Sequence, residues 1–315
     1  MWDSDVEDEI LANVGIPLPR SVALANSNIT HAHPRDARIR LDEARHVYVH
    51  TDSNGQQQEF SISVSGVWAR YFAPFNARAI VDTYFDRWAS DGESNYHACI
   101  MASRAQSRSD EDIKQDIMKR WADNGAQASA DGTYMHRQIE LALGRMTYDG
   151  RPPEMKHFLQ WVWDFAEVNR WQVFRTEWSI FSEQTCIAGQ IDAIFRDAIG
   201  NFHMVDWKRC KEALRPDAQI QFGRFGKPPL VDLVDNAYSH YVVQQNLYCT
   251  ILQTEYNFSL QSMKLIRCHP DAESYQIVCV PFLDQGMLCN IMQENRGTFS
   301  YVCGAAAPQR HLGGC

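Results

Sequence analysis

The stretch GQIDAIFRDAIGNFHMVDWKRC, residues 189–210, is decisive for the fold because it has the pattern of a β-hairpin. Two runs rich in apolar residues flank DAIGN, a segment typical of a turn. If DAIGN is the turn, Arg196 pairs with Phe202, and Asp192 lies directly opposite Asp206. Directly opposed side chains have Cβ atoms about 4.5–5.5 Å apart. The sequence therefore predicts two neighbouring carboxylates on one face of a hairpin.

Two carboxylates at this spacing repel each other, and burial adds to the cost unless a cation lies between them. Their oxygen ligands suit Mg²⁺ or Mn²⁺. In the second strand, side chains alternate, so Met204, Asp206 and Lys208 share a face and Lys208 points toward the same site. Glu177, on the preceding strand, can reach this face too. The alternative is a surface hairpin with two exposed acids and an ordinary lysine.

Two predicted helices carry further polar residues. His136 lies on the first helix, where it either adds a metal ligand or is a structural histidine at a helix edge. On the second helix, Gln244 and Tyr248 lie one turn apart on an apolar stripe. Because a buried glutamine needs a partner, Gln244 either bonds a buried backbone group or faces a groove that holds a phosphate or a base.

From residue 129 onward, the predicted elements follow the order of an α/β fold with a central mixed sheet flanked by helices. The first helix should begin at a cap of Ser129 or Asp131 and end at Gly144. Strands and helices then follow over residues 154–168, 175–181, 186–197, 202–210, 237–257, 262–268, 274–280 and 283–295.

Upstream of this core, HVYVHTDSNGQQQEFSISVS, residues 46–65, predicts another hairpin, with a type I′ turn at Asn54-Gly55. Helices are also expected over residues 76–90 and about 110–121. We divide the chain into four parts. They are an irregular acidic segment, an N-terminal hairpin and helical region, the α/β core and a flexible tail, at residues 1–36, 37–128, 129–300 and 301–315.

Composition limits the class of protein. The chain has 315 residues and a net charge of −9, and no apolar run is long enough to cross a bilayer, so we expect no membrane partner. Nine cysteines without a C-x-x-C pair favour an intracellular, reducing compartment, cytoplasm or nucleus, over a disulfide framework or a zinc ribbon. Residues 206–227 are locally basic, with six Lys/Arg against three acids. This window includes Arg209 and Lys211.

Taken together, the motifs resemble the PD-(D/E)XK nuclease superfamily. In chain order they are G-x-x-x-H in GTYMH, Glu in RTEW, G-x-x-D in GQID, D-x-K in DWK and Q-x-x-x-Y in QQNLY. They are most similar to the branch of RecB nuclease domains, lambda-type exonucleases, the mitochondrial genome maintenance exonuclease and the CRISPR-adaptation nucleases. The resemblance covers roughly residues 129–282, about half of the chain. It implies a restriction-endonuclease-like core with an N-terminal extension.

The resemblance also implies a role for each matching residue. Metal ligands would be His136, Asp192 and Asp206. The catalytic set would be Asp192, Asp206 and Lys208, with Glu177 as a supporting acid. Substrate would be bound by Gln244 and Tyr248 of the motif and by Arg209 and Lys211 of the basic window.

The function expected from the resemblance is a Mg²⁺- or Mn²⁺-dependent deoxyribonuclease, and we expect an exonuclease. Some members hold an iron–sulfur cluster, but Cys268, Cys279, Cys289 and Cys303 are too widely spaced for that pattern, so no cluster is expected. Two alternatives stay open: an inactive nuclease-fold module that binds nucleic acid, and a structure- or sequence-specific endonuclease. The sequence leaves open whether the DNA is single- or double-stranded.

Overall fold

The computed structural model describes residues 15–301, which fall into two compact units. One unit comprises the chain up to Ala73 and from Met135 onward, and the other is Pro74–Tyr134. The first therefore joins the predicted N-terminal hairpin to the predicted α/β core. The acidic residues at the start of the chain lie outside the described residues, as do residues 302–315 of the tail predicted over residues 301–315.

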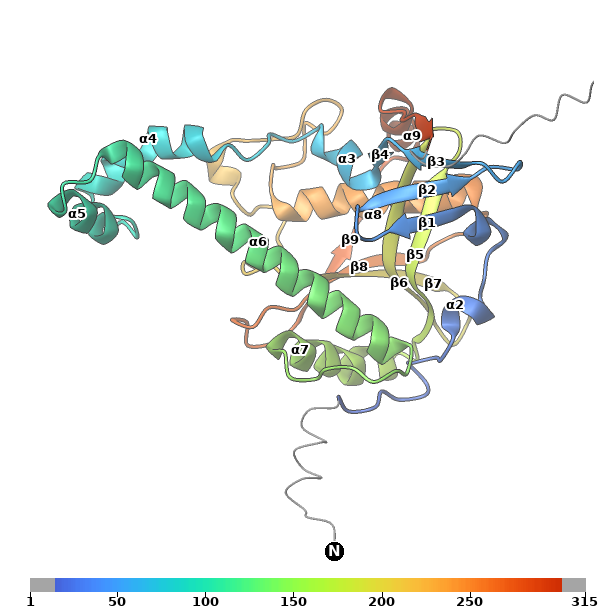
Figure 1. The fold of residues 1–315 in the computed structure, drawn as a ribbon. Coiled ribbons are helices and arrows are strands. Elements are labelled where there is room, and N and C mark those ends of the chain that lie inside the picture. The colour runs from blue at the N-terminus through green and yellow to red at the C-terminus, as the bar shows by residue number, and fades with distance from the viewer. Residues whose placement is uncertain (1–14, 302–315) are drawn as a thin grey trace, which may run out of the picture. The chain divides into compact units, whose positions relative to one another are not determined.

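The main sheet of the first unit is mixed, as predicted. Its strands are β4 (Ile62–Ser63), β5 (Gln172–Ser182), β6 (Ile187–Arg196), β7 (Phe202–Lys208), β8 (Ser262–Arg267) and β9 (Gln276–Val280). The order is β5-β6-β7-β8-β9, with β4 beside the start of β6 (Figure 1). The pairs β7–β8 and β4–β6 are parallel, and the remaining pairs are antiparallel. The hairpin of residues 189–210 forms β6 and β7, and Arg196 pairs with Phe202 as predicted.

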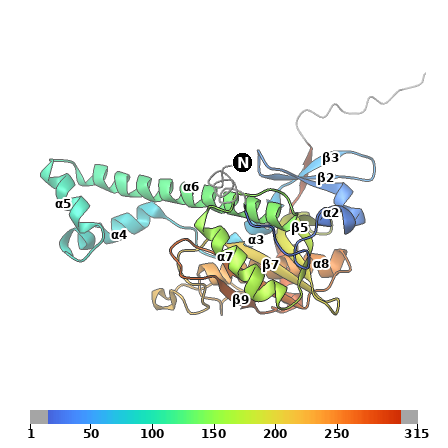
Figure 2. The ribbon, with the colours of Figure 1, turned by 90° about the horizontal axis from the view of Figure 1, so that it is seen from below.

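Helices cover both faces of the main sheet (Figure 1). On one face lies α8 (Ala237–Glu255), with α3 (Val64–Ala69) and α9 (Gln285–Glu294) beside it, around a core that includes Ile194 and Leu265. On the other lies α7 (Pro153–Trp161), which continues as a π-helix over Val162–Glu167. Figure 2 shows this face from below. Its core gathers Trp161 and Trp207 with apolar residues from the end of α6.

A second, smaller sheet is formed by the N-terminal region and the end of the described chain. Its strands are β1 (Ile39–Asp42), β2 (Val47–Thr51), β3 (Gln57–Phe60) and β10 (Phe299–Tyr301), all antiparallel and in that order. Two short helical segments, α2 (Ser27–Thr30) and Pro34–Arg38, lie in the part of the chain predicted to be irregular. The hairpin β2–β3 confirms the prediction for residues 46–65.

The turn of that hairpin differs from the predicted type I′. Only Gly55 has a positive φ, +79°, whereas a type I′ turn needs positive φ at both central residues. Instead, the Gly55 N–H donates to the Asp52 carbonyl at 3.1 Å. The Asp52 carboxylate also accepts from the N–H groups of Asn54 and Gln56. An aspartate that caps its own loop, which is longer than two residues, therefore overrides the Asn-Gly signal.

The second unit is helical, with α4 (Ala77–Ser90), α5 (His97–Ala105) and the first part of α6 (Asp110–Leu143) around a small apolar core. The prediction that a helix begins at Ser129 or Asp131 is wrong, because α6 runs through both residues without a break. Side-chain pairs one turn apart, such as Gln127 Nε2 to Asp131 Oδ1 at 2.7 Å, support the helix there. It ends just before Gly144, as predicted. No helix within residues 15–301 is long and apolar enough to cross a membrane.

Candidate metal centre

The candidate site lies at a gap along one edge of β6, between the stretch that pairs with β4 and the stretch that pairs with β7. β7 pairs with β6 only from Ala193 onward, and β4 pairs with β6 only at Ile187 and Ala188. Asp192 lies in the gap between these two ladders. Its Oδ2 accepts a hydrogen bond from the Trp207 N–H at 2.9 Å, so this carboxylate replaces the backbone carbonyl that would accept that bond in a continuous sheet. The opening thus exposes one edge of β6 to side chains from other elements.

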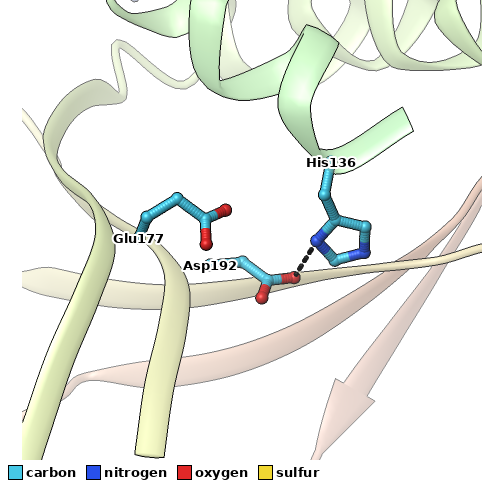
Figure 3. A group of neighbouring side chains, drawn as sticks. All are labelled: His136, Glu177 and Asp192. Atoms are coloured by element: carbon cyan, nitrogen blue, oxygen red, sulfur yellow. Dashed lines mark ion pairs between the residues drawn. The ribbon is translucent and has the colours of Figure 1, made fainter. Parts of the chain in front are cut away.

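Three potential ligand groups converge in this opening, as Figure 3 shows. One donor atom each from His136, Glu177 and Asp192 lies within 4.8 Å of the others. They come from α6, β5 and β6, respectively. His136 Nδ1 lies 3.3 Å from Asp192 Oδ2. The cluster contains two of the three metal ligands implied by the family resemblance, and Glu177 in place of Asp206.

The orientation of His136 suits a metal ligand. Its Nε2 lies 3.0 Å from the carbonyl oxygen of Trp207. Because a carbonyl can only accept, Nε2 must carry a proton, and in a neutral ring this leaves a lone pair on Nδ1. That lone pair faces the carboxylates. A histidine whose second nitrogen donates to a backbone carbonyl is the usual arrangement of a metal-binding imidazole.

Glu177 is held in the cluster by an unusual backbone. Its φ of +46° is left-handed, which is uncommon for a residue other than glycine and costs on the order of 1–3 kcal/mol. The pairs on either side of it, Thr176 with Ala193 and Trp178 with Ile191, keep the ladder with β6. Burial, reinforced by the Asp192 carboxylate, raises the pKa of Glu177 well above its usual range. The acids are therefore crowded.

A second group of charges adjoins the cluster. Lys208 Nζ lies 2.5 Å from Asp206 Oδ2, and the Asp206 side chain is buried whereas that of Lys208 is half-buried. Burial and the Asp192 carboxylate raise the pKa of Asp206 to about 6. Although burial opposes it, the carboxylates of Asp206 and Asp192 raise the pKa of Lys208, which keeps the amine protonated at neutral pH. Lys208 Nζ also lies 4.2 Å from the centre of the Tyr241 ring.

Two tyrosines that the sequence motifs do not identify border the site. Tyr241, on α8, forms the cation–π contact with Lys208. Tyr48 comes from β2 of the small sheet, and burial together with Glu177 and Asp192 raises its pKa. Tyr241 lies three residues before Gln244, and that short spacing could have indicated it. Nothing in the sequence near Tyr48 indicates its position, because the contact depends on the packing of the two sheets.

The predicted pair on α8 also lies beside the opening. Gln244 Nε2 donates to the Tyr248 hydroxyl at 3.3 Å, and Tyr248 is buried. The Tyr248 ring lies against Gly189, where a Cβ atom would come within 2.5 Å of the ring. The missing side chain at position 189 therefore makes room for this tyrosine. Gln244 Oε1 is buried and has no hydrogen-bond partner among residues 15–301.

The remaining predicted residues, Arg209 and Lys211, have other partners. Arg209 Nε donates to the buried carboxylate of Glu154 on α7. This ion pair holds the guanidinium against α7, and a substrate contact by Arg209 stays a prediction. Lys211 is exposed, and its Nζ lies 3.6 Å from Asp271 Oδ2. An exposed pair at this distance leaves the ammonium group accessible to a phosphate.

Replacing His136 by alanine tests whether this residue tunes a metal site. We expect Mn²⁺ affinity to fall by at least about tenfold, with a changed Mn²⁺/Mg²⁺ preference, because the loss of an imidazole removes the ligand that favours the softer ion. The melting temperature should change little. Calorimetric titration with each metal is the measurement, and His46→Ala, at an exposed position, is the control. A large loss of stability at unchanged metal affinity would make His136 a structural residue.

No family model and no curated protein sequence matches the chain. Among solved structures, the chain is similar to the crystal structure of SSO0001, with 13% identity and a TM-score of 0.23, over 52% of this chain and 72% of that one.

Proposed function

We propose that the protein is a divalent-metal-dependent nuclease of the PD-(D/E)XK type that hydrolyses phosphodiester bonds of DNA as an exonuclease. The observation that carries the proposal is the convergence of His136, Glu177 and Asp192 next to the ion pair of Asp206 and Lys208. These five groups occur at the positions of the family motifs in chain order.

The donor set fits Mg²⁺ or Mn²⁺. Carboxylate oxygens are the ligands that both ions prefer, and an imidazole nitrogen adds affinity for Mn²⁺. Asp206 Oδ2 is buried and, despite the close ammonium group, has no donor in hydrogen-bond geometry within the described chain. The raised pKa values of Glu177 and Asp206 reflect negative charge that burial leaves poorly compensated. A cation in the opening would offset this charge.

Each group then has a task in hydrolysis. When bound, the cation would stabilise the negative charge of the phosphate and the further negative charge that develops as water attacks the phosphorus. Asp192, Asp206 and His136 would hold it, with Glu177 as the supporting acid. Lys208, kept protonated by its carboxylate neighbours, would place a fixed positive charge beside the attacking oxygen. Tyr241 positions that ammonium group through its ring.

Cleavage of labelled DNA tests this function directly. We expect linear DNA to be degraded with Mn²⁺ and to stay intact with EDTA, because the carboxylates need a cation to act. Circular single-stranded and closed circular duplex DNA should also stay intact, because an exonuclease has no end from which to start. Cleavage of the circles would indicate an endonuclease. Binding without cleavage in any metal would indicate an inactive binding module.

Gln244 should act on substrate more than on metal. Its Oε1 is buried beside the site and has no partner within the described part of the chain, so it can accept a hydrogen bond from a bound base or a sugar. We expect Gln244→Ala to weaken DNA binding or raise KM by roughly 5–30-fold, the effect of one or two lost hydrogen bonds. Mn²⁺ affinity should be preserved. If the variant only lowers the melting temperature, Gln244 is a structural hydrogen-bonding group of the core.

A further inference from the structure

Residues 209–236 form the loop between β7 and α8 (Figure 1). This loop exposes three large apolar side chains within six residues. Ile220 is 52% exposed, Phe222 61% and Phe225 46%. A single exposed apolar residue is common on protein surfaces, but a group of them indicates a contact surface. Two of the three are aromatic, and they lie in or just after the short 3₁₀ helix Ile220–Phe222.

The backbone that carries these rings is anchored to the rest of the unit. The Gly226 N–H donates to the Leu233 carbonyl at 2.9 Å, and the Lys227 N–H donates to the Tyr71 carbonyl at 2.7 Å. Leu230, on the same loop, is buried in the core beneath α8. The rings are therefore presented from a fixed base.

Positive charges lie between the rings and on either side of them along the chain. Residues 215–227 carry three exposed cations, Arg215, Arg224 and Lys227, and one acid, Asp217. Arg224 Nε lies only loosely, at 4.0 Å, beside the buried Asp235. Alternating aromatic and cationic side chains match the chemistry of a polynucleotide, whose bases stack on rings and whose phosphates attract cations.

We propose that this loop binds single-stranded DNA by stacking bases on Phe222 and Phe225, with Arg215, Arg224 and Lys227 at the phosphates. A single strand is favoured over a duplex because the bases of a duplex already stack on one another and do not offer their faces. The loop follows Lys208 directly, and Arg215 lies at most about 25 Å from it along the chain. This inference rests on the proposed nuclease function and assigns it a single-stranded substrate.

Binding measured without cleavage tests the loop separately from the metal site. Fluorescence anisotropy with a labelled 20-nucleotide strand in EDTA would compare the wild type with Phe222→Ala/Phe225→Ala. We expect the double variant to bind at least about tenfold more weakly, because each lost stacking contact typically has an effect of that order. Phe222→Trp/Phe225→Trp should bind as the wild type does. Phe282→Ala, which removes a phenylalanine that is 50% exposed elsewhere, is the matched control and should have no effect.

The salt dependence adds a second readout. Removing Arg215, Arg224 and Lys227 should reduce the magnitude of the slope of log K against log salt concentration by about 2, because each phosphate contact with a single strand contributes roughly 0.7. Unchanged single-strand affinity in the double variant would overturn the loop proposal even if the protein cleaves DNA. Conversely, loss of binding in that variant, in a protein that cleaves no DNA with Mn²⁺, would support the loop and contradict the nuclease function. Equal affinity of the wild type for the matching duplex would also contradict the single-strand proposal.

Discussion

Replacing Asp192 by asparagine should abolish cleavage, with a fall of at least about 10²–10³ in rate, and remove Mn²⁺ binding at the site while the fold stays intact. Asp192 contacts His136 and also raises the pKa values of Glu177 and Asp206, so it is the central charge of the site. Asparagine keeps the size of the side chain and an oxygen that can accept the Trp207 N–H. The variant therefore removes the charge and preserves the local hydrogen bond.

The stability of the wild type and of Asp192→Asn, compared with and without Mn²⁺, shows whether this charge serves the metal or the fold. Without metal, Asp192→Asn should be at least as stable as the wild type, because one of several crowded like charges is gone. With Mn²⁺ at about 100 times its Kd, the wild type should gain about 2.7 kcal/mol, and the variant should gain nothing. For a protein of this size the gain is a shift of about 4 °C in melting temperature.

Thermal melts and calorimetric titration of the two proteins decide the point. Asp271→Asn, at an exposed aspartate, is the matched control and should bind Mn²⁺ as the wild type does. Unchanged Mn²⁺ affinity in Asp192→Asn would contradict the metal-site assignment. So would a large loss of stability in the metal-free variant, since it would make Asp192 a structural residue.

The sequence predicted those parts of the fold that depend on local patterns. The register of the β6–β7 hairpin followed from alternation around DAIGN, and Arg196 pairs with Phe202 as expected. The long helix α8 followed from the periodicity of apolar residues, whereas the bond from Gln244 to the Tyr248 hydroxyl is neither of the two partners considered for Gln244. In each case the residues that determine the structure lie close together in the chain.

Other features depend on residues far apart in sequence or on backbone geometry. The partner of Arg209 is Glu154, on a different helix, and no local pattern indicates that pair. Tyr48 reaches the site only because the small sheet packs beside the main one. The left-handed backbone of Glu177 is equally hidden, because glutamate carries no preference for that conformation. Most of the charged groups of the candidate site were therefore predictable from local sequence patterns, whereas part of what surrounds and orients them was not.

Replacing Lys208 by alanine should separate chemistry from binding. Lys208 carries the wrong charge to ligate a cation, so Mn²⁺ should still bind, or bind slightly better, because a nearby positive charge is gone. DNA should also bind, since one lysine is a small part of a multi-contact phosphate interface. Cleavage should fall by about 10²–10³, the usual effect of losing one preorganised group that stabilises the transition state.

The ion pair of Lys208 with the buried Asp206 adds an expectation that concerns stability. Removing Lys208 leaves Asp206 as a buried carboxylate without its cationic partner, which typically costs about 3–5 kcal/mol. Mn²⁺ should restore much of this loss, because the cation replaces the missing positive charge. A metal-free Lys208→Ala protein should therefore melt well below the wild type, and the difference should narrow as Mn²⁺ is added.

Lys208→Arg provides the stricter comparison because it keeps the charge. It should not restore full activity, since a planar guanidinium cannot reproduce a compact ammonium group 4.2 Å from the centre of the Tyr241 ring. Single-turnover cleavage rates of the three proteins at saturating Mg²⁺, with metal and DNA affinities measured separately, give the answer. If Lys208→Ala cleaves at the wild-type rate, the Asp206–Lys208 pair is only a structural ion pair. The D-x-K pattern is then a coincidence, and the nuclease proposal loses its main chemical support.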